Sequence, residues 1–329
     1  MTVDESLDAA TAMIAGARTV ALACHVEPDG DALGSMLGLH HLCRSTGRAS
    51  VASWPEPFVV APHYTYLPGL DTCTKPADFP VEPDVMVTFD CGSLERLQEL
   101  GIPALRARDA GRLIVLDHHK TNDEYGSINV IDPRAAATAV VVRRLAERLG
   151  WPLTRDAALC LYTGLVTDTG RFQYEVTTPE VFELAAELAS FGLPIPSMSR
   201  QLFEEHRFDY LKLIACCLER AELDRELGFV ATWITEDDLN RQGVSLQETE
   251  GLIDLVRRAQ EADVACVLKE TPGGIRVSLR SVGTIDVGVI ASQFHGGGHA
   301  FASGFTAPGT VASVLADIRT ALATVRSGR

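Results

Sequence analysis

The sequence places one histidine and two aspartates in a short segment that runs into an apolar, helix-like stretch. The segment is HVEPDGDALGS, residues 25–35, and it contains His25, Asp29 and Asp31. Imidazole and carboxylate side chains bind metal ions and transfer protons. Grouped this closely, they are costly to bury unless a partner neutralises their charge. The chemistry of this segment therefore depends on which other residues the fold brings to it.

The same pattern of an apolar run followed by an acid or an imidazole occurs twice more. The segment VTFDCGS contains Asp90, and IVLDHHK contains Asp117, His118 and His119. In open parallel sheets, functional groups gather beyond the carboxyl ends of the strands. We therefore expect all three segments to meet at one sheet edge. A fourth acidic position, Asp168 in VTDTG, ends a helical pattern in the same half of the chain.

Apolar runs and helical patterns alternate through the first half of the chain. Continuous apolar runs predict buried strands at 19–25, 84–90 and 112–119. The helical patterns cover 31–47, 135–150, 154–170 and 179–190. Uninterrupted apolar strands separated by helices favour a mainly parallel sheet that helices cover on both faces. We expect this α/β domain to span residues 1–190.

The pattern changes in the last third of the chain. A proline-containing segment and a helix at 210–223 predict a linker over 191–223. Strands then follow at 228–234, 262–270 and 274–281, with helices at 236–242, 248–260 and near 310–325. We expect a second, smaller α/β domain at 224–329, with the active site in the cleft between the two domains.

Each acidic residue has a simple structural explanation when it is considered alone. Asp31 could cap the following helix, Asp90 could shape a turn, and Asp168 could cap a helix or shape a turn. Together with the histidines, however, these groups would repel one another and lose hydration unless cations neutralise them. The cluster therefore predicts bound divalent metal ions. His40, His41, His63 and His206 have no such surroundings, and we expect them to be structural.

The types of ligand restrict the metal. Cys24 precedes His25 on a strand, so alternation directs it to the opposite face, and Cys91 has no partner cysteine. Carboxylate and imidazole ligands without sulfur favour Mn²⁺, with Mg²⁺, Co²⁺ and Fe²⁺ as alternatives, over structural zinc. The ligand set is too large for one ion. It suits two ions roughly 3.5–4 Å apart, an arrangement used in phosphoester hydrolysis.

Glycines near the carboxyl terminus form a second feature. The segment HGGGHAFASG, residues 295–304, could be a simple turn, or its backbone N–H groups could converge on an anion beside His299. In GIRVSLRS, alternation places Arg276, Ser278 and Arg280 on one strand face, which could be merely solvated. Arg171, Phe172 and Tyr174, which follow Asp168, could contact a base or a phosphate, or could simply pack and carry surface charge.

Composition limits the partners. The 329-residue chain has a net charge of −15, whereas proteins that bind long nucleic acids usually carry a basic surface. No apolar run is long enough for a membrane helix, and the first residues lack a basic region typical of a signal peptide. The eight cysteines include no CxxC pair, so we expect reduced thiols and a cytoplasmic protein.

The motifs resemble those of a known superfamily. HVEPDGDALGS, VTFDCGS, LDHH and VTDTG resemble, in order, the four motifs of the DHH phosphoesterases, and GGGHAFASG preceded by VSLRS resembles the nucleotide-binding domain of the DHHA1 subfamily. The resemblance covers nearly the whole chain. In size and layout it is greatest to the nanoRNases, which are bifunctional oligoribonucleases and 3′-phosphoadenosine-5′-phosphate (pAp) phosphatases. Some actinobacterial relatives also cleave cyclic-di-AMP or its linear product pApA.

The resemblance implies a role for each residue of the motifs. One manganese ion would be held by His25, Asp29 and Asp90, and the second by Asp31, Asp90, His118 and Asp168. Asp117 would orient an imidazole, and His119 would face the substrate phosphate, so the catalytic residues would be Asp90, Asp117 and His119. Substrate would be bound by Arg280, Gly297, Gly298, His299, Arg171 and Ser303.

The implied activity is hydrolysis of short RNA, pAp, pApA or cyclic-di-AMP by a hydroxide that two metal ions activate. We expect small nucleotide substrates, a homodimer, and neither long nucleic acid nor membrane as a partner. Three alternatives remain: a RecJ-like single-strand exonuclease, a family II pyrophosphatase, and a nucleotide sensor that has lost catalysis.

Overall fold

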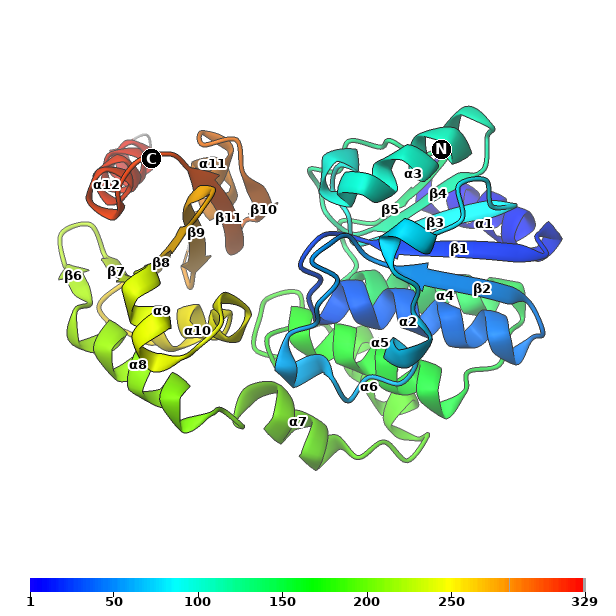
Figure 1. Ribbon diagram of the computed structural model, residues 1–329, viewed down its shortest axis with the longest axis horizontal. Coiled ribbons are helices and arrows are strands. Elements are labelled where there is room, and N and C mark those ends of the chain that lie inside the picture. The colour runs from blue at the N-terminus through cyan, green and yellow to red at the C-terminus, as the bar shows by residue number, and fades with distance from the viewer. Residues whose placement is uncertain (284, 328–329) are drawn as a thin grey trace. The chain divides into compact units, whose positions relative to one another are not determined.

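The computed structural model describes residues 1–283 and 285–327 and divides into two compact units (Figure 1). The first unit is Met1–Leu202 and the second is Phe203–Arg329. Within the described residues, no helix combines the length and the apolar character that crossing a membrane would need.

The first unit is built on a five-stranded sheet in which all neighbouring strands are parallel. The strand order is β2-β1-β3-β4-β5, with bounds Ala49–Ser53, Thr19–Cys24, Val85–Phe89, Leu113–Asp117 and Ile128–Ile131. The three central strands are those that the apolar runs predicted, and β3 and β4 are buried throughout. The edge strands β2 and β5 were not predicted, because both are short and only partly buried, which weakens their apolar pattern.

Helices cover both faces of this sheet, which confirms the predicted layering (Figure 1). On one face, Ala21, Met86 and Val115 pack against α3 and the 3₁₀ segment Leu94–Leu100 that precedes it. Helices α2 and α4 lie against the other face, and α5 packs on α2. The helices of this unit are α1 Val3–Gly16, α2 Gly30–Ser45, α3 Gly101–Asp109, α4 Thr138–Leu149, α5 Arg155–Asp168, α6 Pro179–Ala189 and α7 Ile195–Phe203.

The start of α2 corrects one detail of the sequence interpretation. Asp29, and not Asp31, is the N-cap, and its Oδ1 accepts hydrogen bonds from the backbone N–H groups of Asp31 and Ala32. Asp31 lies inside the first turn. Two aspartates at this spacing are both reasonable caps, and only the path of the chain decides between them.

The second unit contains a mixed six-stranded sheet. Its order is β10-β11-β9-β8-β7-β6, with bounds Gly297–His299, Ala302–Ala307, Gly274–Ser281, Val264–Thr271, Phe229–Ile234 and Glu222–Asp224. Among the strand pairs that the structure describes here, β7 and β8 are parallel and the others are antiparallel. The three predicted strands correspond to β7, β8 and β9. The glycine-rich segment, interpreted as a turn or an anion-binding loop, forms strand β10.

Among the described residues of this unit, the helices are α8 Phe208–Glu219, α9 Glu236–Gln242, α10 Leu252–Val256, α11 Val287–Ser292 and α12 Val311–Ser327. Helices α11 and α12 pack on one sheet face, and α8 and α10 pack on the other face over β7 and β8. The helix predicted at 248–260 was too long. The chain instead forms a 3₁₀ turn, Leu246–Thr249, and the short α10, with Gly251 between them.

Candidate metal centre

The predicted metal ligands meet at one edge of the parallel sheet. His25 directly follows β1, Asp90 directly follows β3, and His118 directly follows β4. Helix α2 adds Asp29 and Asp31 at its first turn, and α5 adds Asp168 at its last residue. This is the location where open parallel sheets collect functional groups, because all the strands end there together.

Two groups of donors form within this cluster. His25, Asp29 and Asp90 offer ligand atoms that all lie within 4.8 Å of one another, and so do Asp31, His118 and Asp168. Asp90 is close to both groups: its Oδ2 is 3.8 Å from His25 Nε2, and its Oδ1 is 3.5 Å from His118 Nε2. Two neighbouring cation sites that share Asp90 are therefore compatible with these positions.

The orientation of the histidines suits metal binding. His118 Nδ1 donates to the Ala135 carbonyl at 3.1 Å, and His25 Nδ1 lies 2.8 Å from the Val26 carbonyl. A carbonyl accepts only from a protonated nitrogen, so the His118 ring presents Nε2 to the carboxylates, whereas His25 Nδ1 also lies 3.0 Å from the Arg96 guanidinium. His118 Nε2 is 3.1 Å from Asp168 Oδ2 and 3.9 Å from Asp31 Oδ2. A proton or a metal ion must lie between these atoms, and the donor set fits a hard divalent cation.

The close approach of these charged groups shifts the pKa values of the carboxylates in opposite directions. Burial, together with the charges of Asp90 and Asp168, raises the pKa of Asp31 well above its usual value. Burial alone would also raise the pKa of Asp90, but the surrounding imidazoles of His119, His25 and His118 lower it. Such opposing shifts within one cluster are typical of functional sites.

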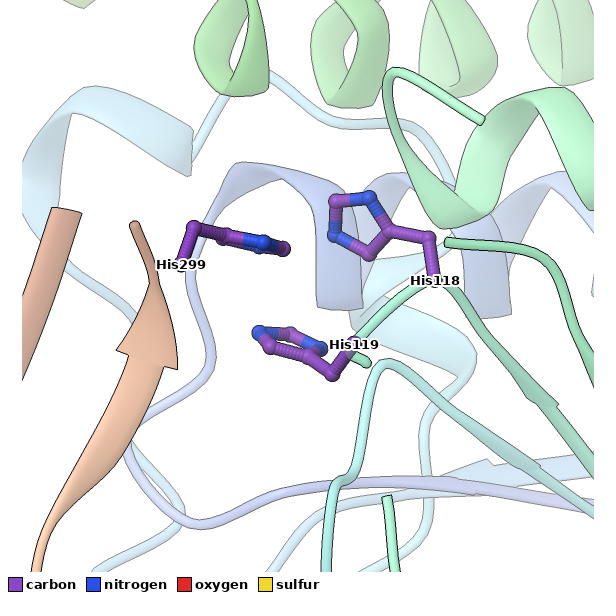
Figure 2. Close-up of side chains that lie close together, drawn as sticks. All are labelled: His118, His119 and His299. Atoms are coloured by element: carbon purple, nitrogen blue, oxygen red, sulfur yellow. The ribbon is translucent and has the colours of Figure 1, made fainter. Parts of the chain in front are cut away.

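His119 has different surroundings from His118, although the two are consecutive. Its Nδ1 donates to Asp117 Oδ1 at 2.7 Å, and the two rings are inclined at 73° with centroids 4.9 Å apart (Figure 2). Burial would lower the pKa of His119, but Asp90 and Asp117 raise it to about 9. These two carboxylates therefore favour the protonated imidazole, which can donate a hydrogen bond.

Asp117 is held by donors on both of its oxygens. Oδ1 accepts from the backbone N–H groups of His118 and His119, at 2.7 and 3.1 Å, besides the His119 ring. Oδ2 accepts from the Asn122 side chain at 2.5 Å. Asp117 is therefore placed to orient His119 and to fix the turn that follows β4. Sequence reasoning did not identify Asn122, because nothing in its local pattern distinguishes it.

The contribution of the N-terminus of α4 to this site was also not predicted from the sequence. The N-cap of this helix is Ala137, which has no capping side chain, and Asp31 of α2 accepts from the N–H groups of Thr138 and Ala139 at 2.5 and 3.0 Å. The Thr138 hydroxyl donates to Asp90 Oδ1 at 3.0 Å. The helix dipole and these donors stabilise the buried carboxylates. The one signal in the sequence was that the segment AAAT, residues 135–138, provides no side chain to cap the helix that follows.

Glycines allow α2 and α5 to approach so closely that Asp31 and Asp168 lie in the same cluster. A Cβ on Gly34 would collide with the Cys160 carbonyl of α5, and a Cβ on Gly164 would lie 2.6 Å from the Asp31 carboxylate. No side chain fits between the backbones at these positions. The glycines are therefore part of the metal centre although they offer no ligand.

The residues after Asp168 form a tight left-handed turn. Gly170, Arg171 and Phe172 all have positive φ angles, and the Phe172 ring stacks on Phe182 with centroids 5.4 Å apart. The Tyr174 ring lies where a Gly170 Cβ would be. Packing contacts thus exist for Phe172 and Tyr174, as one of the two interpretations expected.

In the second unit, the sheet brings two of the predicted substrate residues, Arg280 and His299, into one row. Arg280 of β9 is opposite Ala302 of β11, which is in turn opposite His299 of β10. Arg276, Ser278 and Arg280 are half-exposed while their neighbours are buried, so the predicted alternation is confirmed. Arg280 Nη1 donates to the Leu279 carbonyl, and its buried Nε has no hydrogen-bond partner among the described residues.

The other predicted substrate residues differ in their environment. Gly298 is opposite Ser303 and has a φ of +129°, a conformation that favours glycine. Ser303 is buried, and its hydroxyl donates to the Val287 carbonyl at 2.8 Å. Its side chain therefore lies on the core side of β11 and not with the Arg280 row.

The four histidines expected to be structural have ordinary contacts. His40 is buried between the hydroxyls of Ser50 and Thr72, and His41 Nε2 bonds to the Pro68 carbonyl. His63 and His206 pack edge-on against Tyr64 and Tyr210.

Similarity to characterised proteins agrees with this arrangement. Residues 19–165 match the DHH family, N-terminal domain, and residues 228–327 match the DHHA1 domain. The bifunctional oligoribonuclease and PAP phosphatase NrnA of Thermus thermophilus is 32% identical over 291 residues, which are 88% of this chain and 84% of the relative. The chain belongs to the DHH family of phosphoesterases.

Other relatives extend this DHH assignment. NrnA of Bacillus subtilis is 29% identical over 87% of this chain and 88% of the relative. The structure of an exopolyphosphatase-related protein from Bacteroides fragilis matches 98% of this chain and 96% of that chain, with a TM-score of 0.87 and 26% identity. The structure of RecJ from Thermus thermophilus shares the fold, with 15% identity and a TM-score of 0.56. The match covers 97% of this chain and 55% of that chain. DHH enzymes use divalent metals, and the acidic and histidine clusters fit that requirement.

Proposed function

We propose that this protein is a manganese-dependent phosphoesterase that hydrolyses short oligoribonucleotides, pAp, and linear or cyclic adenine dinucleotides. The observation that carries the proposal is the pair of donor groups, His25–Asp29–Asp90 and Asp31–His118–Asp168, that Asp90 connects. The similarity to proteins named oligoribonuclease and PAP phosphatase supports the substrate class. A relative from Geobacillus thermodenitrificans named cyclic-di-AMP phosphodiesterase is 26% identical over 87% of this chain, which supports including dinucleotides.

The residues of the two donor groups would hold the metal ions. The set contains only carboxylate and imidazole donors, which supports manganese over a sulfur-bound zinc. Two such cations would supply Lewis-acid stabilisation of the phosphoryl oxygens and an activated water. Asp90 would contribute to both sites, because its two oxygens face His25 and His118.

His119 would act on the substrate phosphate. Its Nδ1 is committed to Asp117, so Nε2 is the nitrogen that can donate to an oxygen on the reacting phosphorus. The carboxylates of Asp90 and Asp117 raise the pKa of His119 and so favour the protonated ring. A donor that strengthens as negative charge develops on phosphoryl oxygens accelerates the reaction. Asp117 and Asn122 would hold the ring in this orientation.

The second unit would bind the nucleotide. Arg280, with its unsatisfied buried Nε, would donate to a phosphate, and Gly297, Gly298 and His299 would bind the terminal nucleotide beside it. Arg171 would add a further phosphate contact. The net charge of −15 disfavours a long nucleic acid and supports short substrates. We also propose a homodimer, and a cytoplasmic location in keeping with eight free cysteines.

Turnover assays on defined substrates test the proposal. With Mn²⁺, we expect hydrolysis of pAp, pApA and RNA of two to five nucleotides, and far slower hydrolysis of long single-stranded DNA and of pyrophosphate. EDTA should abolish activity, and added Mn²⁺ should restore it. The Asp90→Asn variant is the matched negative control. Preference for long DNA would favour a RecJ-like exonuclease, preference for pyrophosphate would favour a pyrophosphatase, and tight binding without turnover would favour a sensor. Full activity in metal-stripped protein would refute the metal mechanism.

A further inference from the structure

The segment that connects β5 to α4, residues 132–137, supports the metal centre without offering a ligand. Within it, the Ala135 carbonyl accepts the Nδ1 proton of His118. At its end, the Thr138 hydroxyl donates to the Asp90 carboxylate. The position of the segment therefore affects both the orientation of an imidazole and the environment of a carboxylate in the centre. Its sequence, DPRAAA, contains few polar side chains that could hold it in place.

Asp132 fixes the start of this segment. It directly follows β5, and it is only 1% exposed. Its backbone N–H donates to the Asp117 carbonyl at 3.0 Å, and its own carbonyl accepts from the Ala135 N–H at 2.9 Å. The second bond closes a four-residue turn. The position of Asp132 is therefore coupled to that of the carbonyl that accepts from His118.

A cation from α4 binds the buried Asp132 carboxylate. Oδ2 accepts from Arg144 Nη1 at 2.5 Å, and Oδ1 accepts from the Arg134 backbone N–H at 3.1 Å. The Arg134 side chain lies 3.5 Å from Oδ1 but is 88% exposed, so its charge contributes little. Among the described residues, Arg144 is thus the main cation that compensates this carboxylate for its lost hydration.

The ion pair links the two elements that the segment connects. Arg144 lies six residues after Thr138, or about 9 Å along α4, and reaches back to the end of β5. The helix and the strand are therefore tied together on either side of the three alanines. Both charged groups lose hydration, so such a pair adds less stability than its attraction suggests, and its main effect can be to fix local geometry.

We propose that the ion pair of Asp132 and Arg144 positions the metal centre. It holds the Ala135 carbonyl where that carbonyl accepts from His118, and so keeps the metal-binding nitrogen directed at the carboxylates. Neither charged residue belongs to a donor group, so both act through His118. The inference rests on the manganese centre proposed above and names two residues outside it on which its metal affinity depends.

Calorimetric titration of metal-free protein with Mn²⁺ tests the proposal. Arg144→Ala should raise a dissociation constant for Mn²⁺ by about tenfold, the lower end of the range for partners that orient metal ligands. Arg143→Ala is the matched control, because the neighbouring Arg143 pairs with Glu147 and Glu187, which lie outside the segment. This variant should keep wild-type Mn²⁺ affinity, although it also removes ion pairs from α4.

Two further changes test whether the charges act as a pair. Asp132→Asn preserves the size of the side chain and should weaken Mn²⁺ binding as much as Arg144→Ala does, with no further loss in the double variant. Arg144→Lys should recover part of the affinity, because lysine restores the charge without the planar guanidinium. These smaller changes keep the test decisive even if Arg144→Ala does not fold, and urea denaturation of each metal-free variant measures stability separately.

Wild-type Mn²⁺ affinity in Arg144→Ala would overturn the proposal, and so would an equal loss of affinity in Arg143→Ala. Additive losses in the double variant would show that the two residues do not act as a pair. The titration requires no substrate. If the wild type bound Mn²⁺ but did not hydrolyse pApA, the proposed activity would fail while the positioning role could still be measured.

Discussion

At the scale of single residues, neighbouring side chains obtain different roles from the acceptors that hold them. His118 gives its Nδ1 proton to the Ala135 carbonyl, and His119 gives its Nδ1 proton to the Asp117 carboxylate. The first ring then presents Nε2 to the carboxylates of Asp31, Asp90 and Asp168, and the second is held beside them with a raised pKa. The difference in role follows from these hydrogen bonds, since the residue type is the same.

Replacing each histidine should separate metal binding from catalysis. His118→Ala should lower manganese content, with activity partly recovered at high Mn²⁺. His119→Ala should keep its manganese but lose turnover by about 10²–10³-fold, the scale for removing one transition-state donor. Elemental analysis and rates across a Mn²⁺ titration measure both effects. If metal rescued His119→Ala and not His118→Ala, the two assignments would have to be exchanged.

An ion pair in the second unit leads to a prediction about the stability of the fold in acid. The Asp238 carboxylate accepts from Arg220 Nη2 at 2.9 Å and from the Thr235 N–H at 2.9 Å, and the bond from Arg220 is the main cause of its lowered pKa. A lowered pKa in the folded state stabilises the fold above the unfolded-state value of about 4, and this contribution is lost as pH falls below it.

Asp238→Asn should therefore lower the free energy of unfolding by about 1–3 kcal/mol at pH 7. The difference between variant and wild type should shrink progressively below pH 4. Urea denaturation of metal-free protein at several pH values measures it. A difference that stays constant into acid would show that the carboxylate charge contributes nothing.

At the scale of elements, the metal centre depends on how closely two helices approach. Helix α2 carries Asp31 and α5 carries Asp168, and glycines remove the side chains that would separate them. The carboxylate of Asp31 also caps α4, which has no cap of its own. The positions of the ligands therefore depend on how these three helices pack against one another.

Gly34→Ala should disturb both stability and metal binding. Its Cβ would meet the Cys160 backbone carbonyl, which cannot move independently of α5. We expect a loss of about 1–3 kcal/mol in the free energy of unfolding, together with reduced manganese content.

Gly38→Ala is the matched control for this change. There the new Cβ would meet the end of the Leu161 side chain, which can rotate away, so the loss should be smaller. Chemical denaturation and elemental analysis of both variants test this order. Equal losses at the two positions would contradict the role given to close backbone contact.

At the scale of the whole molecule, the two units carry different parts of the proposed site. All the proposed metal ligands belong to Met1–Leu202, whereas Arg280 and Gly297–His299 belong to Phe203–Arg329. The division predicts that changes in the second unit alter nucleotide binding without altering the metals.

Arg280→Ala should raise KM for pApA while the manganese content stays unchanged. The reason is that the lost guanidinium contacts a phosphate in our proposal and no metal ligand. Arg276→Ala, on the same face of β9, is a useful comparison and should have a smaller effect. Loss of manganese from Arg280→Ala would mean that the proposed division between the units is wrong.

Local patterns in the chain were enough to predict the central strands of both sheets and the residues that follow β1, β3 and β4. Buried parallel strands need continuous apolar runs, and functional groups collect where such strands end, so both signals lie within a few residues. Contacts between distant segments had no such signal. Thr138 bonds to Asp31 across 107 positions, and Asn122 reaches Asp117 only after the turn beyond β4 closes. Which aspartate caps α2 and which glycines join α2 to α5 both depend on packing, which exists only once the chain has folded.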